Sequence, residues 1–346
     1  AQVLPFTPAG GSVYSATGSS LSIAAGRVSY VLGLHGPCAS YDTACSSALT
    51  AGHAGLRAMQ MSECSVALVA GVTLTLTPGT GTSFGIAGMT SASGRSHTFD
   101  VRANGYARGE ACGALALQHS ASHASLDMLG SAVRQDGRSA SLTAPNGQAQ
   151  QGLITAALSD CATAANALTL SEAHGTGTAL GDPIEAGSIA GALLASRGTG
   201  VALLAVGGVK ANIGHAEPAA GMTGLLRLAV GLSCGMAAPN AQLRVLNPHL
   251  RGAIVGTGCA VATHVGALGE LLARVGSVSS FGYSGTIVHA VMQCHSTSST
   301  RTQPLVLTFT RRAFLWQAQT HPLAQRRSPS SEHTALFRSP AAGALH

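Results

Sequence analysis

Residues 41–52 read YDTACSSALTAG and place Cys45 between small and hydroxylated residues, directly before a stretch with helical spacing. Apolar and small residues then recur at positions 45, 48, 49, 52, 56 and 59, which is the periodicity of one helix face. A thiol at a helix N-terminus meets the positive end of the helix dipole, so we expect the pKa of Cys45 to be lowered. Unpaired backbone N–H groups at such a site can also bind a developing oxyanion. This segment alone fits a catalytic nucleophile and a small buried cysteine equally well.

A second segment, residues 171–187, reads SEAHGTGTALGDPIEAG and places His174 before a turn rich in glycine. Thr176 and Thr178 alternate with glycines, so their hydroxyls can line a channel that the backbone approaches closely. Asp182 precedes a proline, which favours the start of a helix at this point. The segment therefore predicts a histidine in a loop that leads into a helix.

A third segment, residues 207–221, reads GGVKANIGHAEPAAG and holds Lys210, His215 and Glu217 between an expected strand and an expected helix. Lys210 is the only lysine among the 19 basic residues of the chain. That bias arises by chance or because a compact ammonium, and not a guanidinium fork, is needed at this position. A lone histidine is usually structural, but two in separate loops beside the only lysine favour a catalytic site.

Four segments, in order, resemble the motifs of the β-ketoacyl synthases, the condensing enzymes of polyketide and fatty-acid synthesis: DTACSSAL, EAHGTGTALGDPIEA, VKANIGHAEPAAGM and SSFGYSGTIVHAVM. They are similar to the polyketide-synthase branch in particular, and the resemblance covers residues 12 to about 294. It implies the thiolase fold, an α/β architecture in which two similar halves form a layered αβαβα sandwich, and a homodimer. Cys45 stands closer to the first residue than the family pattern provides, so we expect the first half to be incomplete through truncation at its start.

The resemblance also implies roles for these residues. Cys45 is expected to take an acyl chain from the phosphopantetheine thioester of an acyl carrier protein, with no cofactor bound to the chain itself. His174 and His215 are expected to stabilise the enolate that forms when a malonyl-type extender loses CO₂. Lys210 is expected to support the loop and to pair with Glu217. The further roles implied are substrate binding by Thr176, Thr178, Phe281 and Tyr283, an oxyanion hole formed by the backbone N–H groups of Cys45 and Tyr283, support by Glu217, Asp182 and Glu185, and no metal ligand.

Some positions differ from the family pattern. Tyr283 replaces the more usual phenylalanine at the gating position, and Ile287 replaces a usual asparagine. The second change alters how that loop is held, because asparagine side chains often satisfy backbone groups in turns. Neither change removes a catalytic group.

Two alternatives to an active synthase remain open. A non-elongating member would act as a carrier-binding or scaffold subunit, and such members typically lack the cysteine or one histidine, which this chain keeps. A truncated, inactive ketosynthase fragment is supported by the missing opening strands. A degradative thiolase is disfavoured, because its second cysteine has no counterpart in SSFGYSGT.

Composition limits the other classes of function. Hydrophobic residues make up 46% of the chain, charged residues only 9%, and glycine contributes 44 residues, which suits a large, well-buried α/β body. Residues 296–346 hold six arginines and one acid, Glu332, so this tail supplies +5 of the net charge of +6. The body has no basic stripe that would favour nucleic-acid binding, and no apolar run reaches the roughly 20 residues of a membrane span. The eight cysteines form no CxxC pair, which favours reduced thiols and a cytoplasmic location, with a plastid as the alternative.

The elements that must position these residues alternate between strands and helices, as in a layered α/β domain. We expect helices near residues 21–34, 45–59, 148–165, 181–195 and 221–232, and strands near 38–44, 65–74, 109–119, 129–137, 201–209, 258–265, 274–281 and 286–293. The strand at 65–74 is a continuous apolar run, so we expect it to be buried. The expected organisation is a first half over residues 1–165 with Cys45, a second half over 166–295 with both histidines and Lys210, and a linker with a basic, flexible tail over 296–346. Other polyketide synthase domains are expected as further partners.

Overall fold

The fold is taken from a computed structural model, which describes residues 15–119, 126–198, 200–269 and 273–295. The chain divides into two units, of which the first consists of Ala1–Ser20 with Thr300–His346 and the second of Leu21–Ser299. The first unit contributes the short helix α1 (Ser15–Ser19). The expected linker and tail over 296–346 lie outside the described residues, and all that follows concerns the second unit.

The larger sheet has six strands in the spatial order β3-β10-β9-β4-β5-β7. These strands are β3 (Leu126–Gln135), β10 (Thr286–His295), β9 (Ala273–Phe281), β4 (Leu168–Glu172), β5 (Leu204–Gly207) and β7 (Cys259–Val261). Strand β10 is antiparallel to both of its neighbours, whereas β9, β4, β5 and β7 run parallel to one another. Glu172 at the end of β4 lies opposite Gly207 at the end of β5, so the loops that follow these two strands meet at one edge of the sheet.

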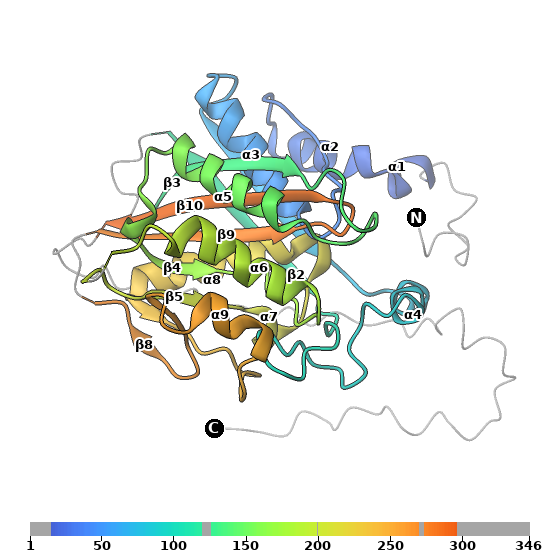
Figure 1. Cartoon of the computed structure of the whole chain (residues 1–346). Coiled ribbons are helices and arrows are strands. Elements are labelled where there is room, and N and C mark those ends of the chain that lie inside the picture. The colour runs from blue at the N-terminus through green and yellow to red at the C-terminus, as the bar shows by residue number, and fades with distance from the viewer. Residues whose placement is uncertain (1–14, 120–125, 199, 270–272, 296–346) are drawn as a thin grey trace, which may run out of the picture. The chain divides into compact units, whose positions relative to one another are not determined.

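Helices cover both faces of this sheet. On one face lie α5 (Gly147–Asp160) and α6 (Gly181–Ile189), and on the other lie α3 (Ser47–Gln60) and α8 (Ala220–Cys234). Figure 1 shows α5 and α6 in front of β10, β9 and β4, with α8 behind these strands. Each face has its own apolar core: Leu193 and Leu204 belong to the first, and Leu170, Leu228 and Val288 belong to the second. The strands are apolar on both faces because both faces are buried.

The smaller sheet consists of β1 (Val66–Thr73) and β2 (Ala111–Gln118), which pair antiparallel. Its inner face packs on α3 and α8, where Ala48, Val69 and Met222 form a third core cluster. Its outer face is open to solvent: Leu68 is 45% exposed and Val72 is 50% exposed. The described residues therefore form four layers in the order α, β, α, β, which agrees with the expected αβαβα sandwich whose first half is incomplete.

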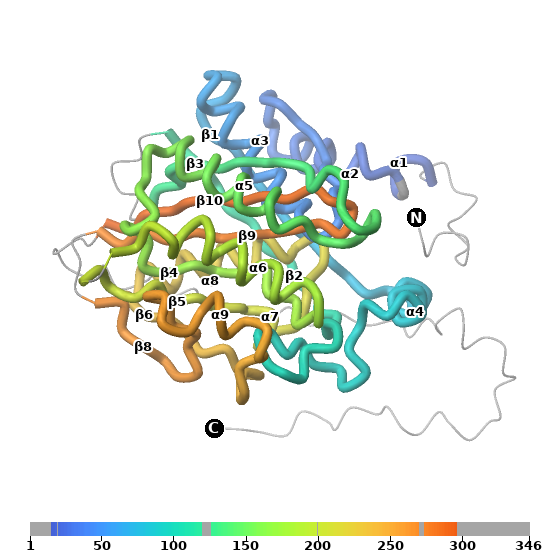
Figure 2. The backbone as a smooth tube through the Cα atoms, viewed as in Figure 1, coloured from blue at the N-terminus to red at the C-terminus, as the bar shows by residue number. Residues whose placement is uncertain are grey.

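The remaining elements are short or lie at the periphery. They are α2 (Leu21–Leu32), α4 (Pro78–Ile86), η3 (Ala165–Ala167), η4 (Ala190–Leu194), α7 (Lys210–Ile213), η5 (Glu217–Ala219), β6 (Met236–Ala237), η6 (Pro248–Leu250), α9 (Arg251–Ile254) and β8 (Gly266–Ala267). In Figure 2 the backbone passes from β1 to α4 (cyan), which lies away from the six-stranded sheet. Within the part of the chain that the structure describes, no helix is long and apolar enough to cross a membrane.

Two expectations from the sequence differ from the structure. Residues 38–44 form no regular strand, because backbone groups there bond to nearby side chains: the N–H of Thr43 donates to Ser47 Oγ at 2.9 Å. The strand at 65–74 was expected to be buried, but side chains of β1 alternate between the core and solvent. Strand β3 pairs with β10 and so belongs to the six-stranded sheet, while the boundary after residue 165 stays a prediction.

Candidate active site

Cys45 lies in a strained turn directly before α3. Ala44 has a φ of 55°, in the left-handed region that residues other than glycine rarely occupy. The turn is tied to β9, because Ser280 Oγ donates a hydrogen bond to the carbonyl oxygen of Cys45 at 2.8 Å. The following loop also comes very close: a Cβ on Gly282 would lie 2.3 Å from the carbonyl oxygen of Thr43. The turn and the loop after β9 are therefore built as one unit around the thiol.

His215 contacts Cys45 directly. Its Nε2 lies 3.0 Å from the Cys45 sulfur, and its Nδ1 accepts a hydrogen bond from the backbone N–H of Glu217 at 3.2 Å. A neutral imidazole carries one proton, so a ring that accepts at Nδ1 carries that proton on Nε2. His215 is fully buried and presents an N–H to the thiol.

His174 repeats this arrangement from the loop after β4. Its Nδ1 accepts from the backbone N–H of Phe281 at 3.2 Å, which leaves the proton of the neutral ring on Nε2. The His174 and His215 rings are 5.6 Å apart and stand at 89° to each other. Two histidines from loops after adjacent parallel strands thus converge, each held in the same tautomer by a backbone donor.

Lys210 is buried behind the histidines. Its ammonium donates to the carbonyl oxygen of His174, and the carboxylates that favour its charged form are those of Glu172, Glu185 and Asp182. The expected pairing of Lys210 with Glu217 is wrong. Glu217 instead pairs with Arg108, with 2.7 Å between Arg108 Nε and Glu217 Oε1.

Buried carboxylates hold the backbone of the His174 loop. Glu185 accepts from the N–H groups of His174 and Gly175 at 2.6 and 2.8 Å, and burial raises its pKa to about 7. Asp182 accepts from Gly177 at 3.0 Å, and burial raises its pKa to about 6. Both residues were expected to play a supporting role, and their bonds go to the loop backbone.

The two threonines of this loop lie side by side beyond His174. Thr176 Oγ1 and Thr178 Oγ1 are 3.2 Å apart, so one hydroxyl donates to the other. The loop packs closely, because a Cβ on Gly177, where φ is 79°, would lie 2.7 Å from the backbone nitrogen of His97. Glycine is therefore required between the threonines.

The electrostatics of the thiol differ from the expectation. The pKa of Cys45 is raised to about 11, chiefly by burial and to a smaller extent by the Glu217 carboxylate. Lys210 and the backbone N–H groups of Tyr283 and Cys45 act in the opposite direction but do not outweigh burial. The expected lowering is wrong because burial of the thiol outweighs these groups, and α3 itself begins two residues later, at Ser47. The two N–H groups that face the sulfur are those expected to form the oxyanion hole.

Both site histidines are neutral near neutral pH. Burial and the nearby Lys210 ammonium hold the pKa of His174 and of His215 well below the usual value. Two neutral rings that each present an Nε2–H can stabilise a developing negative charge on a substrate oxygen without first losing a proton.

Three site residues were not identified from the sequence. The ring of Tyr106 stands edge-on to that of His215 with 4.8 Å between centroids, and Arg108 and Phe84 lie beside Glu217 and Tyr283. Tyr106 and Arg108 come from residues 105–110, GYARGE, where no spacing indicates chemistry. They enter the site because this segment runs beside the His215 loop.

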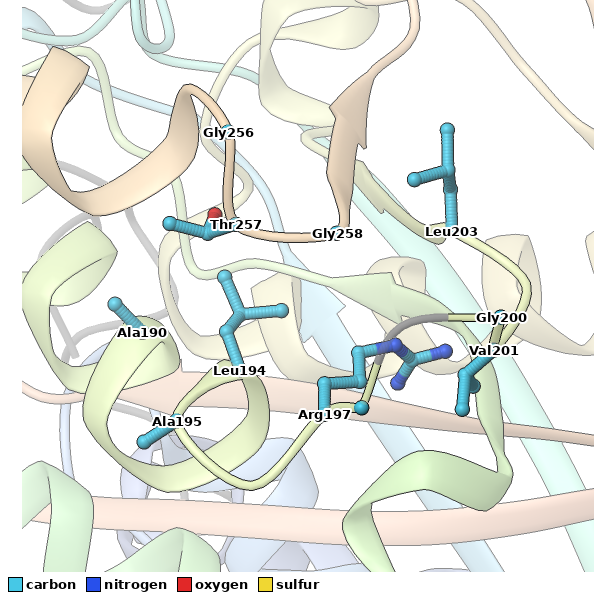
Figure 3. Close-up of a pocket in the computed structure, with 11 residues that line it drawn as sticks. Ala190, Leu194, Ala195, Arg197, Gly200, Val201, Leu203, Gly256, Thr257 and Gly258 are labelled. Atoms are coloured by element: carbon cyan, nitrogen blue, oxygen red, sulfur yellow. The ribbon is translucent and has the colours of Figure 1, made fainter.

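A separate hollow on the surface does not belong to the site (Figure 3). It lies where η4 ends, with Leu194, Arg197 and Thr257 in its lining, and none of the predicted site residues lines it. The guanidinium of Arg197 is engaged with backbone, since it donates to the carbonyl oxygens of Ala165, Leu168 and Ala202. In the described ranges, no three potential metal ligands cluster together.

Comparison with known protein families gives two adjacent matches. Residues 3–123 match the N-terminal domain of β-ketoacyl synthases, and residues 126–244 match the C-terminal domain. One component of the phenolphthiocerol/phthiocerol polyketide synthase of Mycobacterium tuberculosis is 38% identical over 291 residues, which is 81% of this chain and 15% of that protein. Mycoketide-CoA synthase of the same species is 38% identical over 286 residues, which is 81% of this chain and 7% of that protein. The chain thus spans a small part of these relatives.

Solved structures give the same result. The ketosynthase from module 6 of the bacillaene synthase of Bacillus subtilis 168 superposes with a TM-score of 0.76 and 33% identity, covering 82% of this chain and 53% of that one. The oxazolomycin ketosynthase domain of Streptomyces albus JA3453 also gives a TM-score of 0.76 at 33% identity, covering 82% of this chain. The chain spans about half the length of these two domains.

Proposed function

This chain belongs to the β-ketoacyl synthase family, and on that premise we propose that it acts as the ketosynthase domain of a polyketide synthase. The reaction is a decarboxylative Claisen condensation between an acyl group on Cys45 and a malonyl-type extender thioester. One observation carries the proposal: His215 Nε2 lies 3.0 Å from the Cys45 sulfur, and the His174 ring lies 5.6 Å from that of His215. A thiol and two neutral imidazoles thus lie in one cluster, which supports the proposal.

The first step loads the enzyme. The Cys45 sulfur attacks the carbonyl carbon of an acyl thioester, a new C–S bond forms, and the carrier thiol leaves with the proton that Cys45 loses. The backbone N–H groups of Cys45 and Tyr283 face the sulfur and are suited to bind the tetrahedral oxyanion. The Nε2–H of His215 stabilises the sulfur as it loses its proton, because this donor lies within hydrogen-bond distance.

The second step uses the extender. The carbonyl oxygen of the malonyl-type thioester accepts hydrogen bonds from the Nε2–H groups of His174 and His215. Loss of CO₂ leaves an electron pair on the α-carbon, and the two donors stabilise this enolate as its oxygen becomes negative. The α-carbon then attacks the acyl-Cys45 carbonyl, the C–S bond breaks, and a β-ketoacyl thioester leaves. The Cys45 thiolate takes up a proton from water, which restores the thiol.

The partners follow from this chemistry. Substrates arrive on the phosphopantetheine of an acyl carrier protein, and we assign the hydroxyls of Thr176 and Thr178 to that arm, with Phe281 and Tyr283 lining the substrate path. The relatives named above are bacterial polyketide synthases, which supports a cytoplasmic location and gives no support for a plastid. A homodimer and neighbouring synthase domains form part of the same proposal.

The test is intact-protein mass spectrometry after exposure of the chain to an acyl carrier thioester. We expect one acyl adduct, and peptide mapping should place it on Cys45. Addition of a malonyl thioester should then remove the adduct and release a β-ketoacyl product. A Cys45→Ala variant is the control and should remain unmodified. An adduct on another cysteine, with Cys45 free, would overturn the assignment.

The alternative of a non-elongating member gains no support from the site. The non-elongating member predicts loss of the cysteine or of a histidine, and this chain holds all three side chains in one cluster. A carrier-binding scaffold would bind the loaded carrier protein without forming the Cys45 adduct, so the same mass measurement separates the two functions.

A further inference from the structure

Arg108 has no part in the steps above, yet it pairs with Glu217, whose carboxylate acts on the Cys45 thiol. Its side chain is 17% exposed and meets that of Glu217 through two hydrogen bonds, from Nε to Oε1 at 2.7 Å and from Nη2 to Oε2 at 3.0 Å. Two parallel charge-assisted bonds fix orientation as well as distance. Arg108 therefore determines where Glu217 stands.

Glu217 in turn holds His215. Its φ is 42°, a conformation that a residue other than glycine keeps only when its surroundings impose it. In that conformation its backbone N–H donates to His215 Nδ1 at 3.2 Å. This bond keeps the proton of the neutral ring on Nε2, the nitrogen that faces the Cys45 sulfur. The tautomer of His215 thus depends on the place of Glu217.

The backbone around Arg108 grips the same histidine. Arg108 and His215 form a parallel β-bridge. The N–H of His215 donates to the carbonyl oxygen of Ala107 at 2.7 Å, and the N–H of Gly109 donates to the carbonyl oxygen of His215 at 2.9 Å. The segments that contain Arg108 and His215 come so close that a Cβ on Gly109 would lie 2.7 Å from the carbonyl oxygen of Ile213.

The Arg108 guanidinium also contacts Phe84 on α4. The Arg108 Cζ atom lies 5.7 Å from the centre of the Phe84 ring, within the range of a cation–π contact. The Phe84 ring in turn packs edge-on against Tyr283, with 6.3 Å between centroids. Tyr283 supplies one of the N–H groups that face the sulfur. Through Phe84, Arg108 therefore connects the His215 loop with the loop that contains Tyr283.

We propose that Arg108 is a positioning residue that, through Glu217, keeps the Nε2–H of His215 directed at Cys45 and neutralises the carboxylate beside the thiol. The catalytic consequence rests on the proposed function, whereas the effects on the histidine and the thiol do not. Because the Glu217 charge disfavours the thiolate, removal of Arg108 should make Cys45 harder to ionise. Removal of both charges should reverse that effect.

The first measurement is the rate at which iodoacetamide alkylates Cys45 at pH 8.5, followed by peptide mass spectrometry. Arg108→Gln should slow the reaction about tenfold, since one unit of pKa changes the thiolate fraction by about that factor. The double variant Arg108→Gln, Glu217→Gln should return to within about threefold of the unchanged chain. Arg57→Gln is the matched control, because Arg57 pairs with Asp160 at 2.7 Å without contacting His215, and it should leave the rate unchanged.

The second measurement is ¹⁵N NMR of the chain labelled at histidine, with the His215 signals assigned by their loss in His215→Ala. The unchanged chain should show His215 protonated on Nε2, and Arg108→Gln should show a mixture of tautomers. Malonyl decarboxylation should fall about 100-fold in Arg108→Gln, as expected when a reacting group is misplaced by about 1 Å. Arg108→Lys keeps the charge but not the two-pronged bond, so it should lie between the two.

The proposal is overturned if the double variant is no faster than Arg108→Gln, if Arg57→Gln slows alkylation equally, or if the tautomer of His215 is unchanged. If thermal unfolding shows that Arg108→Gln does not fold, Arg108→Lys decides by the same NMR readout. Alkylation and NMR need no acyl or malonyl substrate. An unchanged chain that fails to condense would therefore overturn the proposed function and leave the assignment of Arg108 to be judged separately.

Discussion

The six-stranded sheet and the β1–β2 sheet differ in what covers them. The six-stranded sheet is packed on both faces, and Leu170 on β4 and Val288 on β10 are fully buried. The β1–β2 sheet is packed on one face only, and its outer face exposes about half of Leu68 and Val72. In the described chain, the histidines and Lys210 follow strands of the first sheet, whereas the helix behind Cys45 is held against both.

The proposed catalytic histidines therefore lie on a different sheet from the exposed apolar face. All groups that we assign to the extender belong to the fully packed sheet, so their geometry is supported from several sides. An exposed apolar sheet with free edges invites association with other chains. The low charge of the chain, 9% of its residues, gives little protection against such association. We expect catalytic geometry to depend on the first region and solubility to depend on the second.

The largest effect should come from the histidines at the edge of the six-stranded sheet. Replacing His174 or His215 with alanine removes one N–H donor from the enolate, and loss of one such donor costs about 10²–10³ in rate. Malonyl decarboxylation, followed by CO₂ release, should fall by that factor, while acylation of Cys45 stays measurable. A variant that decarboxylates normally but no longer acylates would show that the histidine acts on the thiol and not on the extender.

A matched pair of leucines tests the difference in packing. Leu170→Ala removes a fully buried side chain and should lower the free energy of unfolding by about 2–5 kcal/mol. Leu68→Ala on the open face should change it by no more than about 0.5 kcal/mol. Urea titrations of both variants measure this difference. Equal losses would mean that the outer face of β1 is covered in solution.

Two cysteines report the same difference as a function of pH. Because burial raises the pKa of Cys45 to about 11, its alkylation by iodoacetamide should rise about tenfold per pH unit from pH 8 to 10. Cys112 lies exposed on β2 and should be alkylated first at pH 8. Peptide mass spectrometry over time measures both rates. Faster labelling of Cys45 at pH 8 would show that the thiol is activated in solution.

The smallest effect on stability should accompany a visible change in solubility. Replacing Leu68 and Val72 with threonine keeps strand propensity but makes the outer face of β1 more polar. Unfolding should change by no more than about 0.5 kcal/mol per site, while light scattering at high protein concentration should decrease. The same substitution at the buried Val69 is the control and should destabilise the chain. Unchanged scattering would mean that the chain associates through another surface.

The sequence predicted which residues lie together better than it predicted the contacts between them. Cys45, His174 and His215 converge because each follows or precedes an element whose periodicity is visible, and strand ends bring their loops together. The partner of Glu217 could not be predicted, because Arg108 lies 109 positions away and no local pattern connects them. The rise in the pKa of Cys45 was not predicted, because it comes from burial by residues that are distant in the sequence. The start of a helix, in contrast, is a local signal.

The fold shows the same limit. The alternation of strands and helices was visible in the sequence, but an apolar run such as residues 66–73 reads alike whether one or both faces are covered. The pairing of β3 with β10 joins strands more than 150 positions apart and leaves no mark in either segment, so the sequence alone could not predict it.

Lys210 has a practical consequence outside catalysis. It is the only lysine side chain in the sequence, and it is 3% exposed. Amine-directed dyes and cross-linkers therefore find no accessible lysine while the fold is closed. Reaction at Lys210 requires the core between β4, β5 and α6 to open, so the rate of its modification reports the rate of that opening. Labelling of Lys210 thus measures how often the core around it opens to solvent.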